Sequence, residues 1–239
     1  MSHIVPRVPG PPIHLRPAAD LAERVLLPGD PHRALHVAQR LLEKPLMFNH
    51  HRGLWGYSGT ARDGAPLTIQ STGMGGPSAA IVVEELIGLG AETLLRIGTC
   101  GALVEGIELG MLLPVVNAIA ADGTSRALGA GDRVYSDPGL LGALAGITGN
   151  RPVTAVSTDL FYDERDGVPE AWVNAGASVV EMEAAAVMQV AKRHGVRAGC
   201  LLAVTDLVGP PRERAPIEQV EEMGLALGET AASVLVGPN

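Results

Sequence analysis

The chain has 239 residues, 46% of them hydrophobic and 18% charged, which suits one α/β domain large enough to bury a core. Its net charge of −8 and its lack of a basic run argue against nucleic-acid binding, but a few arginines in one cleft can still hold a small anion. No apolar stretch is as long as a membrane span. The proline-rich segment 1–12 lacks a hydrophobic signal core, so we expect a flexible arm there, one domain over 13–239 and a cytoplasmic protein.

Apolar runs alternate with segments of helix-forming residues along the chain. A strand over 24–27 leads through a turn into an expected helix over 32–42. A turn-rich stretch over 59–66 precedes a strand over 67–70, a loop over 73–78, a helix over 79–89 and a strand over 93–97. After a strand over 111–120, the weakly patterned segment 122–150 predicts loops with one short helix. The remaining expected elements are strands over 153–157 and 197–205, helices over 182–194 and 218–235, and a loop over 206–216.

This alternation predicts an α/β fold, a single domain with a mixed, largely parallel central sheet flanked by helices. Ligands of open α/β sheets bind beyond the carboxyl ends of the strands. Glycine-rich loops follow Leu27, Gln70 and Ile97, and Asp206 ends a fourth strand. We therefore expect the functional site where these strand ends meet.

The first candidate site is the turn that begins at Gly29 and ends at Arg33. Backbone N–H groups in a glycine turn and at a helix N-terminus favour an anion. Arg33 adds a cationic fork that matches phosphate. An ordinary strand–helix turn with a surface arginine would have the same pattern, so both interpretations stay open.

The second candidate is Arg96, which lies inside an apolar strand. A buried arginine is costly unless it is paired, so it should face something negative. Thr99 could donate its hydroxyl to the same anion. The alternative is that Arg96 is tied to a structural carboxylate such as Glu84 or Glu85.

Two carboxylates, Glu181 and Glu183, enter an expected helix together. One could cap the helix while the other faces a cleft and accepts hydrogen bonds from a sugar diol. A solvated helix N-terminus is the alternative.

Asp206 closes an apolar strand, where a carboxyl group could act as a general acid, although aspartate also often caps a turn. Phe161 and Tyr162 are two of the few aromatic residues and could stack on a planar base or belong to the core.

The two cysteines, Cys100 and Cys200, lack CxxC spacing and are interpreted as reduced, buried thiols, with a catalytic thiol at Cys100 as the alternative. No cluster of His, Cys and Asp has metal-ligand spacing, so we expect no metal.

Taken in order, these motifs closely resemble the hexameric-type purine nucleoside phosphorylase and uridine phosphorylase family. The resemblance runs from about His14 to the C-terminal helix. The motifs that carry it are Pro28–Gly29–Asp30–Pro31 with Arg33, Arg52–Gly53, Gly73–Met74–Gly75 with Pro77–Ser78, Arg96–Ile97–Gly98–Thr99–Cys100–Gly101, and Val180–Glu181–Met182–Glu183–Ala184.

The resemblance implies a phosphate site built from several parts of the chain. Gly29, Arg33, Arg96 and Thr99 would hold phosphate. Arg52 would reach the phosphate of a neighbouring subunit. The expected assembly is a homo-oligomer, a hexamer arranged as a trimer of dimers.

The resemblance also assigns the nucleoside. His14 would touch the ribose 5′-hydroxyl across a subunit interface. Phe161 would pack on the base, and Asp206 would protonate the purine at N7. The remaining nucleoside-binding positions, with Glu183 on the ribose hydroxyls, are Met74, Glu181, Met182 and Glu183.

The implied reaction is phosphorolysis of purine nucleosides, with inorganic phosphate as co-substrate and no cofactor. Similar uridine phosphorylases carry an arginine after the aspartate and a Gln–Arg pair that reads uracil; this chain has Leu207 and the acidic stretch 163–166 there. Uridine phosphorylase and a water-using nucleosidase are the alternatives. Purine enzymes of this type carry a different arginine, farther along the chain from the aspartate, that helps the aspartate donate its proton. Counting along this chain finds Gln219 near that position, and Arg212 or Arg214 could substitute for the arginine.

Overall fold

The computed structural model describes residues 10–209 and 211–236, so most of the expected arm over 1–12 lies outside the described residues. The strands are β1 (Arg24–Pro28), β2 (Glu43–Asn49), β3 (Gly56–Thr60), β4 (Pro66–Gln70), β5 (Thr93–Ala102), β6 (Leu112–Ala120), β7 (Arg133–Tyr135), β8 (Val153–Ser157), β9 (Val179–Glu181), β10 (Arg197–Leu207) and β11 (Glu213–Arg214). The helices are α1 (Pro31–Leu41), the 3-10 turn η1 (His51–Gly53), α2 (Gly76–Leu89), α3 (Gly123–Ala127), α4 (Pro138–Thr148), α5 (Val168–Asn174), α6 (Ala184–His194) and α7 (Ile217–Val236).

The strands form one mixed sheet in the order β11-β10-β6-β8-β9-β5-β1-β4-β3-β2, with β7 paired to β6. Its centre, β4-β1-β5-β10, is parallel, as is β6-β8-β9. Strand β10 pairs directly with β5, and β6, β8 and β9 join the same two strands by the other route, so these five strands close into a small barrel. The predicted α/β class with a mixed sheet is confirmed, and the closure into a barrel is an addition to it.

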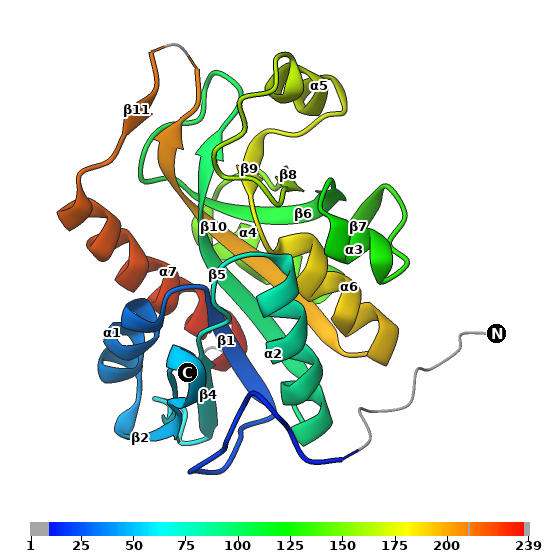
Figure 1. Cartoon of the computed structure of the whole chain (residues 1–239). Coiled ribbons are helices and arrows are strands. Elements are labelled where there is room, and N and C mark those ends of the chain that lie inside the picture. The colour runs from blue at the N-terminus through cyan, green and yellow to red at the C-terminus, as the bar shows by residue number, and fades with distance from the viewer. Residues whose placement is uncertain (1–9, 210, 237–239) are drawn as a thin grey trace.

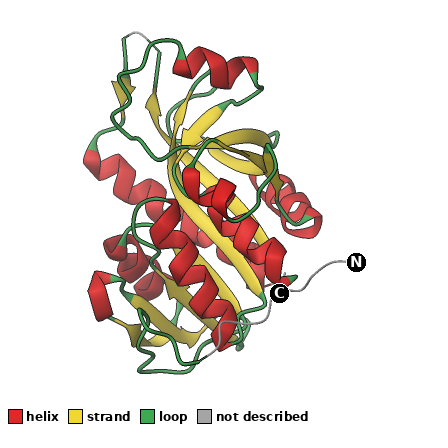
Figure 2. Cartoon of the chain, turned by 45° about the vertical axis from the view of Figure 1, so that its right-hand side comes forward, coloured by secondary structure: helices red, strands yellow, loops and turns green. Residues whose placement is uncertain are grey.

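Helices cover both faces of the parallel strands (Figure 1). Helices α1 and α7 pack together on one face, and α2 and α6 pack together on the other. Two hydrophobic clusters result, one for each face. Seen from the side, the carboxyl ends of the central strands run toward the end of the molecule that carries α5 (Figure 2).

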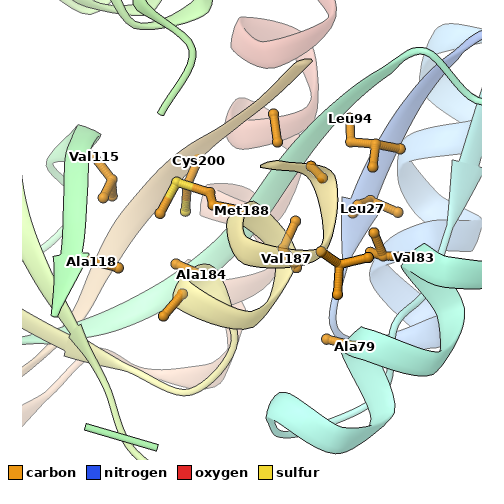
Figure 3. Packing of buried hydrophobic residues seen from close by; sticks show 14 of the residues in the cluster. Leu27, Ala79, Val83, Leu94, Val115, Ala118, Ala184, Val187, Met188 and Cys200 are labelled. Carbon is orange, nitrogen blue, oxygen red and sulfur yellow. The ribbon is translucent and has the colours of Figure 1, made fainter. Parts of the chain in front are cut away.

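The cluster under α2 and α6 depends on small and branched side chains (Figure 3). Val187 of α6 and Val83 of α2 are fully buried in it together with Leu27 of β1. Alanines on α6, such as Ala184, let that helix approach the sheet closely, because they add little volume between backbone and strand. Close packing here fixes the start of α6, where the two candidate carboxylates stand.

The segment 122–150 is more regular than expected, since it holds α3, β7 and α4. Helix α4 is rich in glycine, which weakens the sequence signal, but its ends are well capped. The side chain of Asp137 accepts a hydrogen bond from the backbone N–H of Leu140, Pro138 begins the helix, and Gly149 ends it with a left-handed conformation.

Strand β5 also differs from expectation, because it continues through the glycine-rich stretch to Ala102 instead of ending at Ile97. Pairing with β10 and β9 supplies partners for its backbone at these positions. Sequence analysis also missed β2, β3, β9, β11 and α5, which are short or lie in segments rich in turn residues. Within the described residues, no helix is both long and apolar enough to cross a membrane.

Candidate active site

A cavity of about 590 Å³ opens at the carboxyl ends of β1, β4, β5, β9 and β10. All the predicted site residues except Arg52 and His14 line it. They are Gly29, Arg33, Met74, Arg96, Thr99, Phe161, Glu181, Met182, Glu183 and Asp206. Residues more than 170 positions apart in the sequence thus share one cavity at the edge where ligands of such sheets bind.

Arg33 enters the cavity from the first turn of α1. Asp30 caps this helix by accepting a hydrogen bond from the backbone N–H of His32 at 2.9 Å. The Arg33 side chain packs against Gly224 of α7, where an added Cβ would lie 3.2 Å from Nε. Burial lowers the pKa of Arg33, with Asp30 opposing that effect and Arg96 adding to it. A desolvated cation beside a second cation is a favourable place for an anion.

Arg96 is 3% exposed and lies between two carboxylates. Its Nε donates to Glu181 Oε2 at 3.0 Å and its Nη2 to Glu183 Oε2 at 2.5 Å. Burial opposes the charge of Arg96, but Glu183 and Glu181 outweigh burial, so its pKa lies above the ordinary value. The third nitrogen, Nη1, is buried and has no hydrogen-bond acceptor among the described residues. A buried donor left free in a cavity points to a ligand oxygen.

The glycine at position 98 makes room for this arginine. A Cβ added to Gly98 would lie 2.7 Å from Arg96 Nη2, closer than real Cβ contacts allow. Any side chain here would therefore displace the guanidinium from its two carboxylates. The Gly98–Gly101 stretch serves close approach inside a strand and not a turn.

The alternative in which Glu84 or Glu85 pairs with Arg96 is wrong. Glu84 Oε2 lies 2.6 Å from His194 Nε2, which ties α2 to α6. Glu85 accepts hydrogen bonds from His14 and its neighbours in the N-terminal segment. Both carboxylates lie on α2 and already have other partners, so Arg96 takes its partners from the distant β9–α6 junction instead.

The two carboxylates at that junction have different roles. Glu181 Oε2 accepts hydrogen bonds from the backbone N–H groups of Glu183 at 2.9 Å and Ala184 at 2.8 Å, which caps α6. Its Oε1 accepts a short hydrogen bond from Ser157. Glu181 therefore lines the cavity but has its oxygens committed to the protein.

Glu183 is the carboxylate that faces the cavity with acceptor capacity left. Its Oε1 accepts from the backbone N–H of Gly75 at 2.5 Å, and its Oε2 accepts from Arg96. Burial raises the pKa of Glu183 above its ordinary value, Glu181 adds to that effect and Arg96 opposes it. Each carboxylate oxygen can accept a second hydrogen bond, so this group suits a ligand that presents hydroxyls.

Asp206 lies farther along β10, next to a bulge. Val204 pairs with Cys100 and Asp206 with Gly101, so Thr205 is the extra residue, and both Thr205 and Asp206 line the cavity. Arg96 lies five residues before Gly101 on β5, which separates the Arg96 and Asp206 backbones by roughly 17 Å along the strands. The cavity between them is long enough for a ligand with an anionic end and a second functional end.

Asp206 is itself held by neighbours. Its Oδ1 accepts from Arg212 Nη2 at 2.8 Å, and Thr205 Oγ1 lies 3.0 Å from Oδ2. Gln219 lies exposed on α7 and does not line the cavity. Arg212, brought in by the β10–β11 hairpin, is therefore the cation that reaches this carboxyl group.

The wall beside Asp206 is apolar and partly open. Phe161 is 50% exposed and lines the cavity, whereas Tyr162 is 85% exposed and does not. Neither belongs to the core, so that alternative is wrong for both. Trp172 of α5 also lines the cavity and was missed, because α5 was not predicted. Its only sequence signal is that it is one of two tryptophans in the chain.

Cys100 lines the cavity, but burial raises its pKa well above the ordinary value. A protonated, buried thiol is a poor nucleophile, which argues against the catalytic alternative. Cys200 is also free and buried. Among the residues that the structure describes, no group of three or more His, Cys, Asp or Glu side chains is placed to hold a metal ion.

Arg52 and His14 lie outside the cavity of their own chain. Arg52 is exposed in η1 with a left-handed backbone, at φ 59°. His14 Nδ1 lies 2.7 Å from Glu85 Oε1. Neither residue therefore contributes to the cavity of its own chain, and their contacts across a subunit interface stay predictions.

A mixed α/β sheet whose cavity holds Arg33 and Arg96 beside Glu183, with Asp206 and Arg212 farther along, defines an enzyme class that handles an anion beside a hydroxyl-bearing ligand. The chain belongs to the phosphorylase superfamily, whose family model matches residues 23–237. This confirms the family resemblance found in the sequence.

Three named relatives are similar to this chain over most of its length. A purine nucleoside phosphorylase DeoD-type from Jannaschia sp. is 40% identical over 205 residues, covering 81% of this chain and 86% of the relative. One with the same name from Geobacillus kaustophilus is 35% identical, covering 78% and 82%. A guanosine phosphorylase from Halorubrum lacusprofundi is 37% identical, covering 77% and 78%.

Proposed function

We propose that this protein is a purine nucleoside phosphorylase, a pentosyltransferase that converts purine ribonucleosides or deoxyribonucleosides and phosphate into free base and (deoxy)ribose 1-phosphate. The observation that carries the proposal is the buried Nη1 of Arg96, which has no acceptor among the described residues and lies in the same cavity as Arg33 and Glu183. The similarity to relatives named purine nucleoside phosphorylase supports it.

Phosphate would bind at the arginine end of the cavity. Arg96 keeps Nη1 for it, Arg33 supplies a second cation, Thr99 offers a hydroxyl, and Gly29 leaves room for close approach. Nη2 and Nε of Arg96 are held by Glu183 and Glu181, so the guanidinium is oriented before phosphate arrives. A preorganised donor costs little reorganisation during the reaction.

The sugar would lie next to phosphate, with its hydroxyls donating to Glu183 and with Met74 and Met182 in contact with the ring. Glu181 would act through Arg96 and through the start of α6, because its oxygens already have protein partners. In this arrangement the anomeric carbon C1′ would lie beside a phosphate oxygen.

The bond between C1′ and the base would break as positive charge develops on the sugar and negative charge on the base. A phosphate oxygen then forms the new bond to C1′, and the electron pair of the broken bond stays on the base. Asp206, as the carboxylic acid, gives its proton to purine N7 and is left as a carboxylate beside Arg212. General-acid catalysis of this kind contributes about 10²–10⁴-fold.

The base would lie between Asp206 and the wall formed by Phe161 and Trp172. A purine suits this end better than uracil, because Asp163 of the acidic stretch lines the cavity and is paired with Arg165 at 2.5 Å. Neither residue offers the amide that would pair with a uracil edge.

We also propose a homo-oligomeric assembly and a cytoplasmic location for the enzyme. A homo-hexamer, a trimer of dimers, would let Arg52 and His14 complete the cavity of a neighbouring subunit. Neither residue lines the cavity of its own chain. The catalytic domain would be 13–239, the reaction would need no cofactor, and the protein would work in the cytoplasm.

The test is a panel of inosine, guanosine, adenosine and uridine, each incubated with and without phosphate. Base release from the purine nucleosides that requires phosphate is expected. Release from uridine alone would assign the protein to uridine phosphorylases, and equal rates without phosphate would make it a nucleosidase.

A further inference from the structure

The N-terminal segment around His14 is held by one buried carboxylate. Glu85 of α2 is 7% exposed. Its Oε1 accepts from the backbone N–H groups of Ile13 at 3.1 Å and His14 at 3.0 Å, and its Oε2 accepts from Leu15 at 2.7 Å. The same Oε1 lies 2.7 Å from His14 Nδ1. A single carboxylate thus fixes both the backbone and the ring of His14.

The hydrogen bonds to Glu85 also determine the protonation state of its side chain. Burial alone would raise the pKa of Glu85, but the hydrogen bonds from Leu15 and His14 outweigh it and hold that pKa below its ordinary value. Glu85 is therefore a carboxylate, and a carboxylate only accepts hydrogen bonds. Nδ1 of His14 must therefore carry a hydrogen in this contact, which leaves Nε2 as the ring nitrogen that Glu85 does not occupy.

A second polar group connects this segment to Arg52. Asn49 Oδ1 accepts from the backbone N–H of Arg16 at 2.8 Å, and Asn49 Nδ2 donates to the carbonyl of Leu54 at 2.5 Å. His51 Nδ1 donates to the carbonyl of His14 at 3.0 Å. The His14 segment and the η1 turn that carries Arg52 therefore form one polar unit, held at its two sides by Glu85 and Asn49.

Apolar burial does not orient His14 by itself. Leu15 is fully buried and anchors the chain, but Ile13 on the other side is 74% exposed. The ring of His14 could rotate about its side-chain bonds without disturbing Leu15. Its direction and its tautomer depend on the contact with Glu85.

We propose that Glu85 is a positioning residue that holds the His14 ring through its Nδ1–H, so that Nε2 is the ring nitrogen left to bind a hydroxyl group of the sugar bound to a second copy of the chain. This inference rests on the proposed function, because it needs a nucleoside in the neighbouring cavity. Glu85 touches no substrate; it acts only through His14.

The Glu85→Gln variant tests whether Glu85 holds the His14 segment and its ring. A glutamine amide keeps one acceptor and replaces the other with an NH₂ group, which cannot accept from Leu15 on one side or from Ile13 and His14 on the other. At least one of the contacts that hold the segment is therefore lost, and the His14 ring is no longer fixed in one direction. Glu84→Gln is the matched control, since it removes the adjacent carboxylate of the same helix and its bond to His194 but leaves the His14 segment intact.

The readout compares inosine with 5′-deoxyinosine at saturating phosphate. We expect Glu85→Gln and His14→Ala each to lower kcat/KM for inosine by about tenfold or more, the scale of one lost hydrogen bond to a polar partner, and to change 5′-deoxyinosine by less than about twofold. The double variant should equal either single variant, because the two residues act as one unit. Equal losses on both nucleosides, or losses that multiply in the double variant, would overturn the inference.

A measurement on the unaltered protein covers the case in which Glu85→Gln does not fold. Long-range proton–nitrogen NMR of the histidine rings, with His14 assigned by its absence in His14→Ala, reports which ring nitrogen is protonated. Hydrogen on Nδ1 is expected, and a bare Nδ1 would overturn the inference. If the unaltered protein releases no base from inosine, the proposed function fails by itself. If it does release base, and Glu85→Gln keeps the unaltered ratio of kcat/KM for inosine to kcat/KM for 5′-deoxyinosine, only this inference fails.

Discussion

Arg212 Nη2 lies 2.8 Å from Asp206 Oδ1, and the same guanidinium lies 5.5 Å from the centre of the Phe161 ring. One side chain on a hairpin thus connects the carboxyl group and the aromatic wall at the base end of the cavity. Arg214, the other arginine of that hairpin, stands farther away, with Nε 3.7 Å from Asp206 Oδ1. If Asp206 gives up a proton during the reaction, Arg212 is the group that stabilises the carboxylate left behind.

Replacing Arg212 with Ala should slow the turnover of purine nucleosides by about 10–100-fold, the range for one hydrogen bond to a charged group. The KM for phosphate should change little, because Arg212 belongs to the base end of the cavity. Steady-state kinetics with inosine measures both. Arg214→Ala is the matched control and should have the smaller effect, and a larger effect of Arg214→Ala would reverse the assignment.

Asp206→Asn keeps the shape of the side chain and removes its acidic proton. We expect turnover of purine nucleosides to fall by about 10²–10⁴-fold, the usual contribution of a general acid. Phosphate binding, measured by thermal stabilisation with added phosphate, should persist because Arg33 and Arg96 lie at the other end of the cavity. Normal turnover by this variant would show that Asp206 is not the acid.

Arg33 and Arg96 should respond differently to mutation, although both are proposed to hold phosphate. Arg33→Gln removes a cation that makes no hydrogen bond among the described residues, so it should raise the KM for phosphate with little loss of stability. Arg96→Gln leaves Glu181 and Glu183 buried without their cation, which typically costs about 3–5 kcal/mol. Thermal unfolding separates the two; a comparable loss of stability in Arg33→Gln would mean that Arg33 is a structural residue.

The pKa of Glu183 gives a prediction about pH. Because burial raises this pKa above the ordinary value of 4.5, the stability that the neutral carboxyl group contributes is present at low pH and is lost as pH rises through the folded-state pKa. Glu183→Gln removes this titration. Its melting temperature relative to the unaltered protein should therefore increase as pH rises above 4.5. Melting curves from pH 4 to 8 measure the difference, and a difference that falls with pH would mean that Glu183 has a lowered pKa in the folded protein.

The sequence contains enough information to predict the α/β class and the edge of the sheet at which the site lies. Leu27, Gln70, Ile97 and Asp206 mark strands whose carboxyl ends do meet there. The resemblance to the phosphorylase family, whose model matches residues 23–237, adds the individual site residues as predictions.

The partner of Arg96 could not be predicted from the pattern. Glu84 and Glu85 are nearer in the sequence, but the carboxylates that bind Arg96 are Glu181, which ends the three-residue strand β9, and Glu183, which precedes α6; a strand this short gives no periodic signal. The role of Gly98 was missed for a related reason, since a close approach inside a strand looks like a turn in the sequence.

Arg212 shows a second limit of the sequence. Counting along the chain points to Gln219, but β11 shortens the path by pairing back onto β10, with Arg214 opposite Asp206. A two-residue strand between proline-rich segments has no pattern that identifies it. Helix α5 and its Trp172 were missed for the same lack of pattern.

The most direct test of phosphate attack at C1′ is to follow the reaction of inosine with phosphate by phosphorus-31 NMR. If phosphate held by Arg33 and Arg96 attacks the sugar, one ribose 1-phosphate forms for each hypoxanthine released, and the phosphate signal falls by the same amount. Release of hypoxanthine together with free ribose, while the phosphate signal stays constant, would contradict this mechanism.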